Sequence, residues 1–322
     1  MKNKFWAEKN VLITGYEGFL GSHLSKRLIN YKANIVGLDI KTFRKETILQ
    51  KSDLQKIKTI KGSVSNKKLI NDIAAKYRPQ FVFHLAAQAT IGSCFADPIK
   101  AFNSNIKGTW TLLEALRKNS LLQGIVVASS DKAYGPKKNL PYKETDSLSP
   151  IHPYDTSKSC ADLLSKCYFH SYNLSVNITR CGNIYGPGDF NFSRIIPDTI
   201  LSALKNKTLL IRSSGKFTRD YIYIDDIVDG YLRLAEKMKE KKLYGEAFNF
   251  SNERPVSVAS LVNKIFEILA KKPDYEILNQ ANHEIKNQFL CSEKANKTLG
   301  WKPEFSLDRG LEATIEWYKN LQ

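Results

Sequence analysis

A strand-like run followed by three regularly spaced glycines constrains the fold of this chain more than any other feature. The apolar stretch Val11–Thr14 is followed by Gly15, Gly18 and Gly21, and an amphipathic stretch begins at about Phe19. A glycine directly after a strand permits a tight turn, and a glycine in the first helical turn lets the helix pack closely on the sheet. Three glycines in an unrelated turn are the alternative, but the strand–turn–helix order favours the start of a βαβ unit.

Strand-like and helical stretches alternate from there to about residue 172. Apolar runs at Ile35–Asp39, Phe81–Leu85 and Ile125–Ser129 are interspersed with stretches of helical period at about 98–118 and 155–172. This alternation predicts a parallel sheet covered by helices on both faces. We therefore expect an α/β fold with a Rossmann-type doubly wound parallel sheet.

The regular pattern weakens after about Asn183, where Gly186–Asp189 interrupts it. Shorter strands and helices follow, so we expect a smaller C-terminal α/β lobe that binds the substrate. We expect an NAD-binding sheet domain over residues 1–180 and 221–249, and the substrate-binding lobe over residues 181–220 and 250–322. The sequence contains no internal repeat and no low-complexity linker.

The composition is typical of a globular protein with a large core. The chain has 322 residues, of which 42% are hydrophobic. No segment approaches the roughly 20 apolar residues of a membrane span, so we expect no membrane partner. Residues 1–10 are charged and lack an apolar signal core, which favours a cytoplasmic location. The five cysteines are scattered, and His84 has no partner at ligand spacing, so we expect reduced thiols and no metal.

The net charge of +17 raises the possibility of a nucleic-acid partner. The lysines are spread along the chain, however, and no basic stripe interleaved with aromatic residues is present. The densest run, Lys237–Lys242, ends an amphipathic stretch and is typical of a solvated helix face. We therefore expect no nucleic-acid partner, although the charge would attract an anionic substrate.

The glycine turn and the end of the second strand have the pattern of a dinucleotide site. The second glycine lets a pyrophosphate approach the backbone, and the helix N-terminus faces the phosphates. Asp39 ends the second strand about 20 residues further on, where a carboxylate binds the adenosine ribose. A carboxylate there repels a 2′-phosphate and favours NAD over NADP, an argument that Lys41 and Arg44 weaken. A simple turn aspartate is the alternative reading of Asp39.

Tyr154-Asp155-Thr156-Ser157-Lys158 places a phenol and an ammonium one helical turn apart on the same face. An ammonium beside a phenol favours the phenolate, so Tyr154 could act as a base near neutral pH. In a lysine-rich chain, Tyr-x-x-x-Lys also occurs by chance. The pattern gains weight because Ser129–Lys132 ends an apolar run between it and the dinucleotide-binding start.

Taken together, these motifs make the chain similar to one known protein family over nearly its whole length. It resembles the extended short-chain dehydrogenase/reductase family, specifically its nucleotide-sugar epimerases and dehydratases. The segments that carry the resemblance are Thr14–Gly21, His84–Ala87, Asn105–Thr109, Ser129–Gly135, Tyr154–Lys158, Gly182–Pro187, Arg219–Asp226 and Leu299–Pro303. The segments Gly182–Asp189 and Arg194–Asp198, together with His283-Glu284, look most like the CDP-glucose 4,6-dehydratase branch.

The resemblance implies an enzyme that uses NAD and acts on a nucleotide-diphosphate sugar. Tyr154 would take the proton from a sugar hydroxyl while NAD takes the hydride from the same carbon. Lys158 would hold the phenolate and bind the nicotinamide ribose, and Ser130 would bond the reacting oxygen. The implied cofactor-binding residues are Gly15, Gly18, Phe19, Leu20, Asp39, Ser63, Val64, Leu85, Ala86, Ala87, Asn105, Ser129, Tyr154 and Lys158. The implied substrate-binding residues are Thr90, Ser130, Asn183, Arg194 and Arg219.

Asp131-Lys132 separates two branches of the family. A 4,6-dehydratase needs an acid for the leaving C6 hydroxyl and a base at C5, whereas a 4-epimerase needs neither. By the resemblance, Asp131 would be the acid and Lys132 the base. A lysine base needs a lowered pKa. We expect a 4,6-dehydratase, with CDP-glucose as a candidate substrate and a 4-epimerase as the alternative.

One departure and two other classes of function stay open. Ser63, in Gly62-Ser63-Val64, stands where the family commonly has an acidic residue near adenine. The helices that begin near Pro98 and Asp155 match those of the family's homodimer interface. The loops at 136–150, 186–197 and 280–290 would set the base and the sugar. A nucleotide-sugar-binding protein without turnover and a basic nucleic-acid binder are the remaining alternatives.

Overall fold

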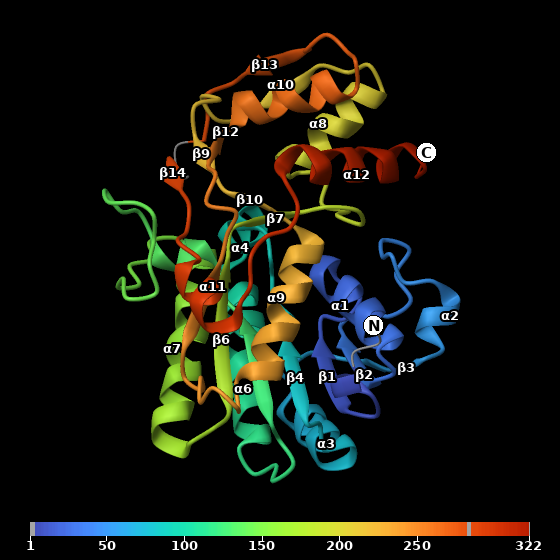
Figure 1. Cartoon of the computed structure of the whole chain (residues 1–322), viewed down its shortest axis with the longest axis vertical. Helices are drawn as coiled ribbons and strands as arrows, with labels where there is room; N and C mark the ends of the chain where they lie inside the picture. The colour runs from blue at the N-terminus through green and yellow to red at the C-terminus, as the bar shows by residue number, and fades with distance from the viewer. Residues whose placement is uncertain (1–3, 282–284, 322) are drawn as a thin grey trace.

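The computed structural model describes residues 4–281 and 285–321 and contains a sheet-based body with a smaller lobe above it (Figure 1). His283 and Glu284, part of the resemblance noted above, lie outside the described residues. None of the helices in the described ranges is long and apolar enough to span a membrane.

A seven-stranded parallel sheet forms the centre of the body. Its strand order is β11-β6-β5-β4-β1-β2-β3. Every neighbouring pair is parallel. The strands are β1 (Asn10–Thr14), β2 (Asn34–Asp39), β3 (Ile57–Lys61), β4 (Phe81–His84), β5 (Gly124–Ala128), β6 (Val176–Cys181) and β11 (Ala247–Phe250). This sheet confirms the predicted doubly wound α/β fold.

Helices bury both faces of the sheet, which explains why its strands are apolar runs without alternation. In β1, Val11 and Ile13 pack on one face with α1 (Phe19–Asn30) and α9 (Ile224–Lys237). Leu12 packs on the other face, against the core formed with α3, α6 and α7. Those helices span Lys67–Tyr77, Gly108–Leu116 and Pro153–Tyr172.

The chain reverses its direction of travel across the sheet between β1 and β4, which places a crevice at the carboxyl ends of these strands. Gly15, after β1, and Ala86, after β4, touch at this point. A side chain at Gly15 would put its Cβ 3.0 Å from the Ala86 nitrogen, and the φ of Gly15 is +74°. Glycine is required there by both the contact and the backbone conformation.

The smaller lobe lies over the carboxyl end of the sheet (upper part of Figure 1). It contains α8 (Ile195–Leu204), α10 (Val258–Ile268) and α12 (Leu307–Lys319). Its short strands are β7 (Asn183–Tyr185), β8 (Leu209–Ile211), β9 (Thr218–Arg219), β10 (Tyr221–Tyr223), β12 (Val256–Ser257), β13 (Tyr275–Ile277) and β14 (Asn287–Gln288). The pairs β7–β10 and β8–β13 are parallel, and β9 lies between β12 and β14.

The remaining elements are short and lie before or between the main strands and helices. They are η1 (Lys4–Trp6), α2 (Lys51–Leu54), α4 (Ile91–Ala96), α5 (Pro98–Phe102), η2 (Asn103–Lys107), η3 (Asp131–Tyr134) and α11 (Glu293–Leu299). In α11, Ala295 and Leu299 pack in the same core as α9, and Trp301 follows them there. The division of the chain into the two discontinuous domains given above stays a prediction.

Candidate active site

A cavity of about 1150 Å³ lies between the carboxyl ends of the sheet strands and the smaller lobe. We expected a set of residues to bind the cofactor, bind the substrate or take part in catalysis. All but one of them line this cavity. From the sheet side these are Gly15, Gly18, Phe19, Leu20, Asp39, Ser63, Val64, Leu85, Ala86, Ala87, Thr90, Ser129, Ser130, Asp131, Lys132, Tyr154 and Lys158. From the lobe side they are Asn183, Arg194 and Arg219. Segments far apart in sequence therefore meet in one cavity.

The start of α1 has the geometry of an anion site. Gly18 is the N-cap residue and makes no side-chain cap bond, so the first amides of α1 are not capped by a side chain. A Cβ at Gly21 would lie 2.1 Å from the Gly15 carbonyl oxygen, so only glycine lets helix and turn pack this closely. A helix N-terminus beside a glycine turn fits the pyrophosphate of a dinucleotide.

The ribose end of the cavity contains an ion pair beside the expected carboxylate. Asp39 is 5% exposed, and the guanidinium of Arg44 pairs with its Oδ1. The buried carboxylate of Glu17 accepts bonds from the backbone nitrogens of Phe43, at 2.8 Å, and Arg44, at 2.6 Å. Glu17 thereby fixes the loop that carries Arg44. Sequence analysis missed this role of Glu17. The only signal in the sequence was an acidic residue between Gly15 and Gly18.

Asn105 is the expected residue that does not line the cavity. Its side chain is 2% exposed. Its Oδ1 accepts from the Gln88 nitrogen at 2.7 Å, and its Nδ2 donates to the Ser157 hydroxyl at 2.9 Å. Asn105 therefore ties the loop after β4 to α7.

His84 has a structural position behind the cavity. Its two ring nitrogens lie 2.8 Å from the Thr14 hydroxyl and 3.0 Å from the Thr109 hydroxyl. Burial lowers the pKa of His84 to about 3, so the ring is neutral. The described residues contain no cluster of side chains that could hold a metal ion.

Ser130, Asp131 and Lys132 form a connected polar turn on the cavity wall at the start of η3. The Ser130 hydroxyl donates to Asp131 Oδ1 at 2.9 Å. Lys132 Nζ donates to the same oxygen at 3.2 Å and to the Asn183 Oδ1 at 3.3 Å. Asp131 is 2% exposed. Hydrogen bonds and an ion pair therefore hold these three side chains together on the cavity wall.

Tyr154 and Lys158 line the same wall, but their electrostatics differ from the expectation. Burial raises the pKa of Tyr154, and a hydrogen bond with the Ser130 side chain opposes this rise. Lys158 Nζ donates to the Ala128 carbonyl at 2.8 Å, and burial lowers the pKa of Lys158 to about 8. The expected lowering of the Tyr154 pKa by Lys158 is therefore not observed, because burial of the phenol dominates.

The residues expected to bind substrate are held from different elements. Arg194 Nη1 lies 3.0 Å from Asp189 Oδ2, and Arg219 Nη1 donates to the carbonyls of Thr218 and Lys286 at 3.0 Å. Thr90 is the N-cap of α4 and accepts from the Ser93 nitrogen at 3.3 Å. Two arginines over the cavity favour an anionic ligand such as a diphosphate.

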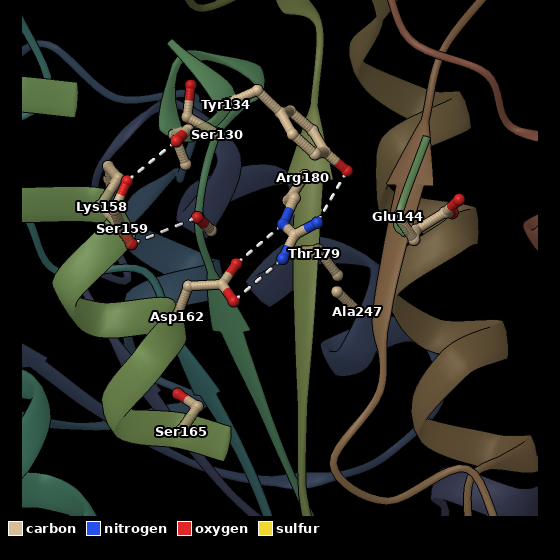
Figure 2. A network of polar contacts seen from close by, with 12 residues as sticks. Ser130, Tyr134, Glu144, Lys158, Ser159, Asp162, Ser165, Thr179, Arg180 and Ala247 are labelled. Atoms are coloured by element: carbon tan, nitrogen blue, oxygen red, sulfur yellow. Dashed lines mark hydrogen bonds and ion pairs between the residues drawn. The ribbon is translucent and has the colours of Figure 1, made fainter. Parts of the chain in front are cut away.

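A buried polar network supports η3 from behind. Arg180 on β6 donates to both carboxylate oxygens of Asp162 on α7, at 2.8 and 3.0 Å. It also donates to the Tyr134 hydroxyl at 2.7 Å, and Tyr134 donates to Asn249 Oδ1 at 2.8 Å. Figure 2 shows Asp162 and Tyr134 approaching the guanidinium from either side. The last residue of η3 is therefore fixed to both β6 and β11.

Asp155 is a cavity residue that sequence analysis did not single out. It lines the cavity directly after Tyr154 and is 3% exposed. Burial raises the pKa of Asp155 to about 6, with Lys132 lowering it and Asp131 raising it. The signal was an acidic residue within Tyr154–Lys158.

Comparison with known proteins places this architecture in a family. The family model "NAD dependent epimerase/dehydratase family" matches residues 11–250. CDP-glucose 4,6-dehydratase of Salmonella typhimurium is 29% identical over 98% of this chain and 92% of its own length. A trifunctional UDP-glucose 4,6-dehydratase, epimerase and reductase of Arabidopsis thaliana is 30% identical over 99% of this chain. The chain spans 48% of that relative's length.

A solved structure extends the likeness to the whole fold. UDP-glucose 4-epimerase of Thermotoga maritima, solved with UDP-glucose, has a TM-score of 0.88 and 28% identity. The match covers 97% of this chain and 100% of that chain. The chain belongs to the NAD dependent epimerase/dehydratase family, which confirms the predicted family, its enzymatic class and NAD as its cofactor.

Proposed function

We propose that this protein is a nucleotide-sugar 4,6-dehydratase that produces a 4-keto-6-deoxy sugar nucleotide. The observation that carries the proposal is the Asp131–Lys132 pair, because it adds a carboxyl group, held by a lysine, to the cavity wall beside Ser130 and Tyr154. Oxidation at a sugar carbon needs only Ser130, Tyr154 and Lys158. Loss of water across C5 and C6 needs further proton donors and acceptors.

The cofactor site combines the residues around the first three strands. Gly15, Gly18 and the start of α1 fit the pyrophosphate, and Asp39 fits the adenosine ribose. When bound, NAD supplies the acceptor and donor of hydride. Lys158 lines the same wall as Tyr154, and Arg194 and Arg219 would hold the substrate diphosphate.

The side chains on the wall connect two proton transfers. Tyr154 takes the proton of the C4 hydroxyl as it passes its own phenolic proton to Ser130, and the Ser130 hydroxyl passes its proton to Asp131 along the 2.9 Å bond. Asp131 then gives a proton to the C6 hydroxyl, which leaves as water. One proton therefore travels from the C4 hydroxyl to the leaving group without exchange with the solvent.

The experiment is to incubate the purified protein with NAD and with CDP-, UDP-, dTDP- and GDP-hexoses in turn and to follow the mass of the sugar nucleotide. We expect one of them to lose the mass of one water. CDP-glucose is the first candidate, because Gly182–Asp189 resembles that branch and a CDP-glucose 4,6-dehydratase is among the relatives. Isomerisation without a change of mass would contradict the proposal.

A 4-epimerase is the second candidate function. The fold match to a UDP-glucose 4-epimerase favours it, since Ser130, Tyr154 and Lys158 suffice for that reaction. The same mass measurement separates the two candidates when it is combined with chromatography of the sugar epimers.

We also propose that the protein is a homodimer formed through the helices that begin near Pro98 and Asp155. Ile99, Trp110 and Leu163 are 73%, 44% and 57% exposed on α5, α6 and α7. Large apolar side chains gathered on adjacent helices are typical of an interface. Light scattering should give twice the mass of one chain, and a monomeric mass would contradict the dimer.

A further inference from the structure

Asp155 faces the polar turn that carries Asp131 and Lys132. Ser159, one helical turn after Asp155, donates to the carbonyl of Ala133 in η3 and to the carbonyl of Asp155, both at 3.0 Å. Residues four apart lie on one face of a helix, so Asp155 and Ser159 share the face of α7 that packs on η3. Asp155 also lines the same cavity as Asp131 and Lys132.

Lys132 is already occupied by other partners. Its ammonium donates to Asp131 Oδ1 at 3.2 Å and to Asn183 Oδ1 at 3.3 Å. Both contacts hold the amino group of Lys132 between Asp131 and Asn183. This geometry favours a positioning role for Lys132 over that of the base at C5.

Asp155 has the opposite character. Within residues 4–281 and 285–321, no lysine, arginine or histidine forms an ion pair with its carboxylate. Its position in the first turn of α7 favours a negative charge, yet an exposed side chain would gain that benefit without burial. A buried carboxylate without an ion-pair partner costs free energy, so stability alone does not account for Asp155.

We propose that Asp155 is the base of the elimination step, which takes the C5 proton and later returns a proton to C5. This inference rests on the proposed 4,6-dehydratase function. Lys132 holds Asp131 and Asn183 in place. Asp155 is therefore assigned as a catalytic residue in addition to Ser130, Asp131, Tyr154 and Lys158.

The atoms and electrons balance in this assignment. The C5–H bond breaks, its proton goes to the Asp155 carboxylate, and its electron pair forms the C5–C6 double bond. The C6–O bond breaks, and the oxygen leaves as water with the proton from Asp131. The hydride removed from C4 returns to C6, and Asp155 gives a proton back to C5 after its carboxyl proton has exchanged with the solvent. No external oxidant, reductant or base is consumed.

The test compares Asp155→Asn with the wild-type protein in heavy water, using the nucleotide hexose that the wild type dehydrates. The variant should still oxidise the sugar, seen as absorbance of reduced nicotinamide when substrate is added. Loss of water should slow by about 100-fold or more. Deuterium should no longer enter C5. Asp155→Glu should recover part of both activities, because it restores the carboxylate.

Two controls separate chemistry from folding. Glu293→Gln removes an exposed carboxylate from the first turn of α11, and it should leave both rates and the melting temperature unchanged. Should Asp155→Asn fail to fold, the wild-type pH profile of C5 deuterium exchange decides the matter. Exchange should fall off below about pH 6, the pKa of Asp155.

The fall of C5 exchange at low pH (the acidic limb) must be assigned to Asp155 rather than to the other titratable groups near it. These are Asp131 and Lys132 on η3, Tyr142 in the loop after η3, Cys94 on α4 and Tyr154 on α7. Because Lys132 lowers the pKa of Asp155, Lys132→Met should move the limb to higher pH and should not abolish exchange.

The inference is overturned if Asp155→Asn retains C5 exchange and water loss at close to wild-type rates, or if only Lys132→Met abolishes exchange. The absence of an acidic limb near pH 6 in the wild type would also overturn it. If the wild type never releases water from any nucleotide hexose, the proposed function itself fails. The two failures are therefore distinguishable.

Discussion

The ion pairs on the two sides of η3 differ in how fully they are buried and hydrogen-bonded. Behind the turn, Arg180 and Asp162 are both fully buried and share two hydrogen bonds, with Tyr134 taking a third donor of the guanidinium. On the cavity side, Asp131 and Lys132 share a single bond, and Asp155 beside them has no ion pair in the described part of the chain.

The difference separates charges that hold the fold from charges that cost stability. A buried pair is tolerated when its geometry is good and its remaining donors are satisfied, as around Arg180. In the cavity, burial raises the pKa of Asp155 and lowers the pKa of Lys158, because the cost of burying these charges is not fully compensated, which is typical of active sites. The Arg180–Asp162 pair behind η3 therefore positions the turn, and the charged groups on the cavity side are available for proton transfer.

Breaking the Arg180–Asp162 pair should have the largest effect on the free energy of unfolding. Arg180→Met leaves the Asp162 carboxylate buried without its main partner, and the free energy of unfolding should fall by about 3–5 kcal/mol. The double variant Arg180→Met/Asp162→Leu should recover much of this loss, because no unpaired charge remains. Urea unfolding measures both.

The matched control is the half-buried pair on α9. Arg233→Met removes the Arg233–Asp229 pair, whose side chains are each 36% exposed, and should cost about 0.5 kcal/mol. Equal losses for Arg180→Met and Arg233→Met would remove the distinction between the two sides of η3.

On the cavity side, Asp131→Asn should act on chemistry rather than on folding. Asparagine can still accept from Ser130 and Lys132, so the turn and NAD binding should persist. Without a transferable proton, the rate of water loss should fall by about 100-fold or more. Single-turnover measurements of cofactor reduction and of sugar mass separate the two steps. Full water loss in this variant would exclude Asp131 from the mechanism.

Lys158→Met should make the protein more stable at neutral pH. The change in the Lys158 pKa from 10.5 to about 8 corresponds to a burial cost of about 3 kcal/mol. Loss of the bond to the Ala128 carbonyl returns about 1 kcal/mol, so the net gain should be about 2 kcal/mol. Urea unfolding at pH 7 measures it, with the exposed Lys239→Met as the control.

The sign of the pH dependence follows from the lowered pKa. Below about pH 8, Lys158 is charged in both the folded and the unfolded chain, and the folded chain bears the full cost. Between about pH 8 and 10.5 the unfolded chain binds more protons, so wild-type stability gains relative to the variant. The advantage of Lys158→Met should shrink over this range. A variant that is less stable at pH 7 would contradict the argument.

The sequence predicted strands of the fold where burial on both faces makes them continuously apolar, as in β1, β4 and β5. It did not predict β6 and β11, because these strands bury polar residues. Arg180 and Thr179 on β6 bond to Asp162 and Tyr231, and Asn249 on β11 bonds to the carbonyls of Tyr142 and Cys291. These partners are far away in sequence, so no local pattern could reveal them.

The gathering of the candidate site residues was predictable because most follow strand ends, and parallel strands end at one edge. Three features were not predictable. The Tyr154 pKa depends on burial by distant segments, and Asn105 faces the loop at Gln88 rather than the cavity. Asp155 becomes notable only when η3 packs on α7 and Lys132 is seen to be occupied.

A third ion pair, Arg44–Asp39 at the cofactor end of the cavity, is more exposed than either of the pairs beside η3 and extends the comparison. Asp39 is buried, whereas the Arg44 side chain is 27% exposed on the cavity wall. Arg44 offsets the charge of Asp39, so the site should bind a 2′-phosphate better than Asp39 alone would allow. Arg44→Met should weaken binding of 2′-phospho-ADP-ribose by about 10-fold and leave ADP-ribose within a few-fold, since one near-surface charge is worth about 1 kcal/mol.

Calorimetric titration with these two ligands measures the ratio directly and needs no turnover. Lys45→Met, which removes an exposed neighbouring charge, is the matched control. An equal loss in both variants would mean that the general positive charge, rather than the Arg44–Asp39 pair, sets the discrimination. An unchanged ratio in Arg44→Met would mean that Asp39 alone selects NAD, and the pair would then belong with the structural pair behind η3.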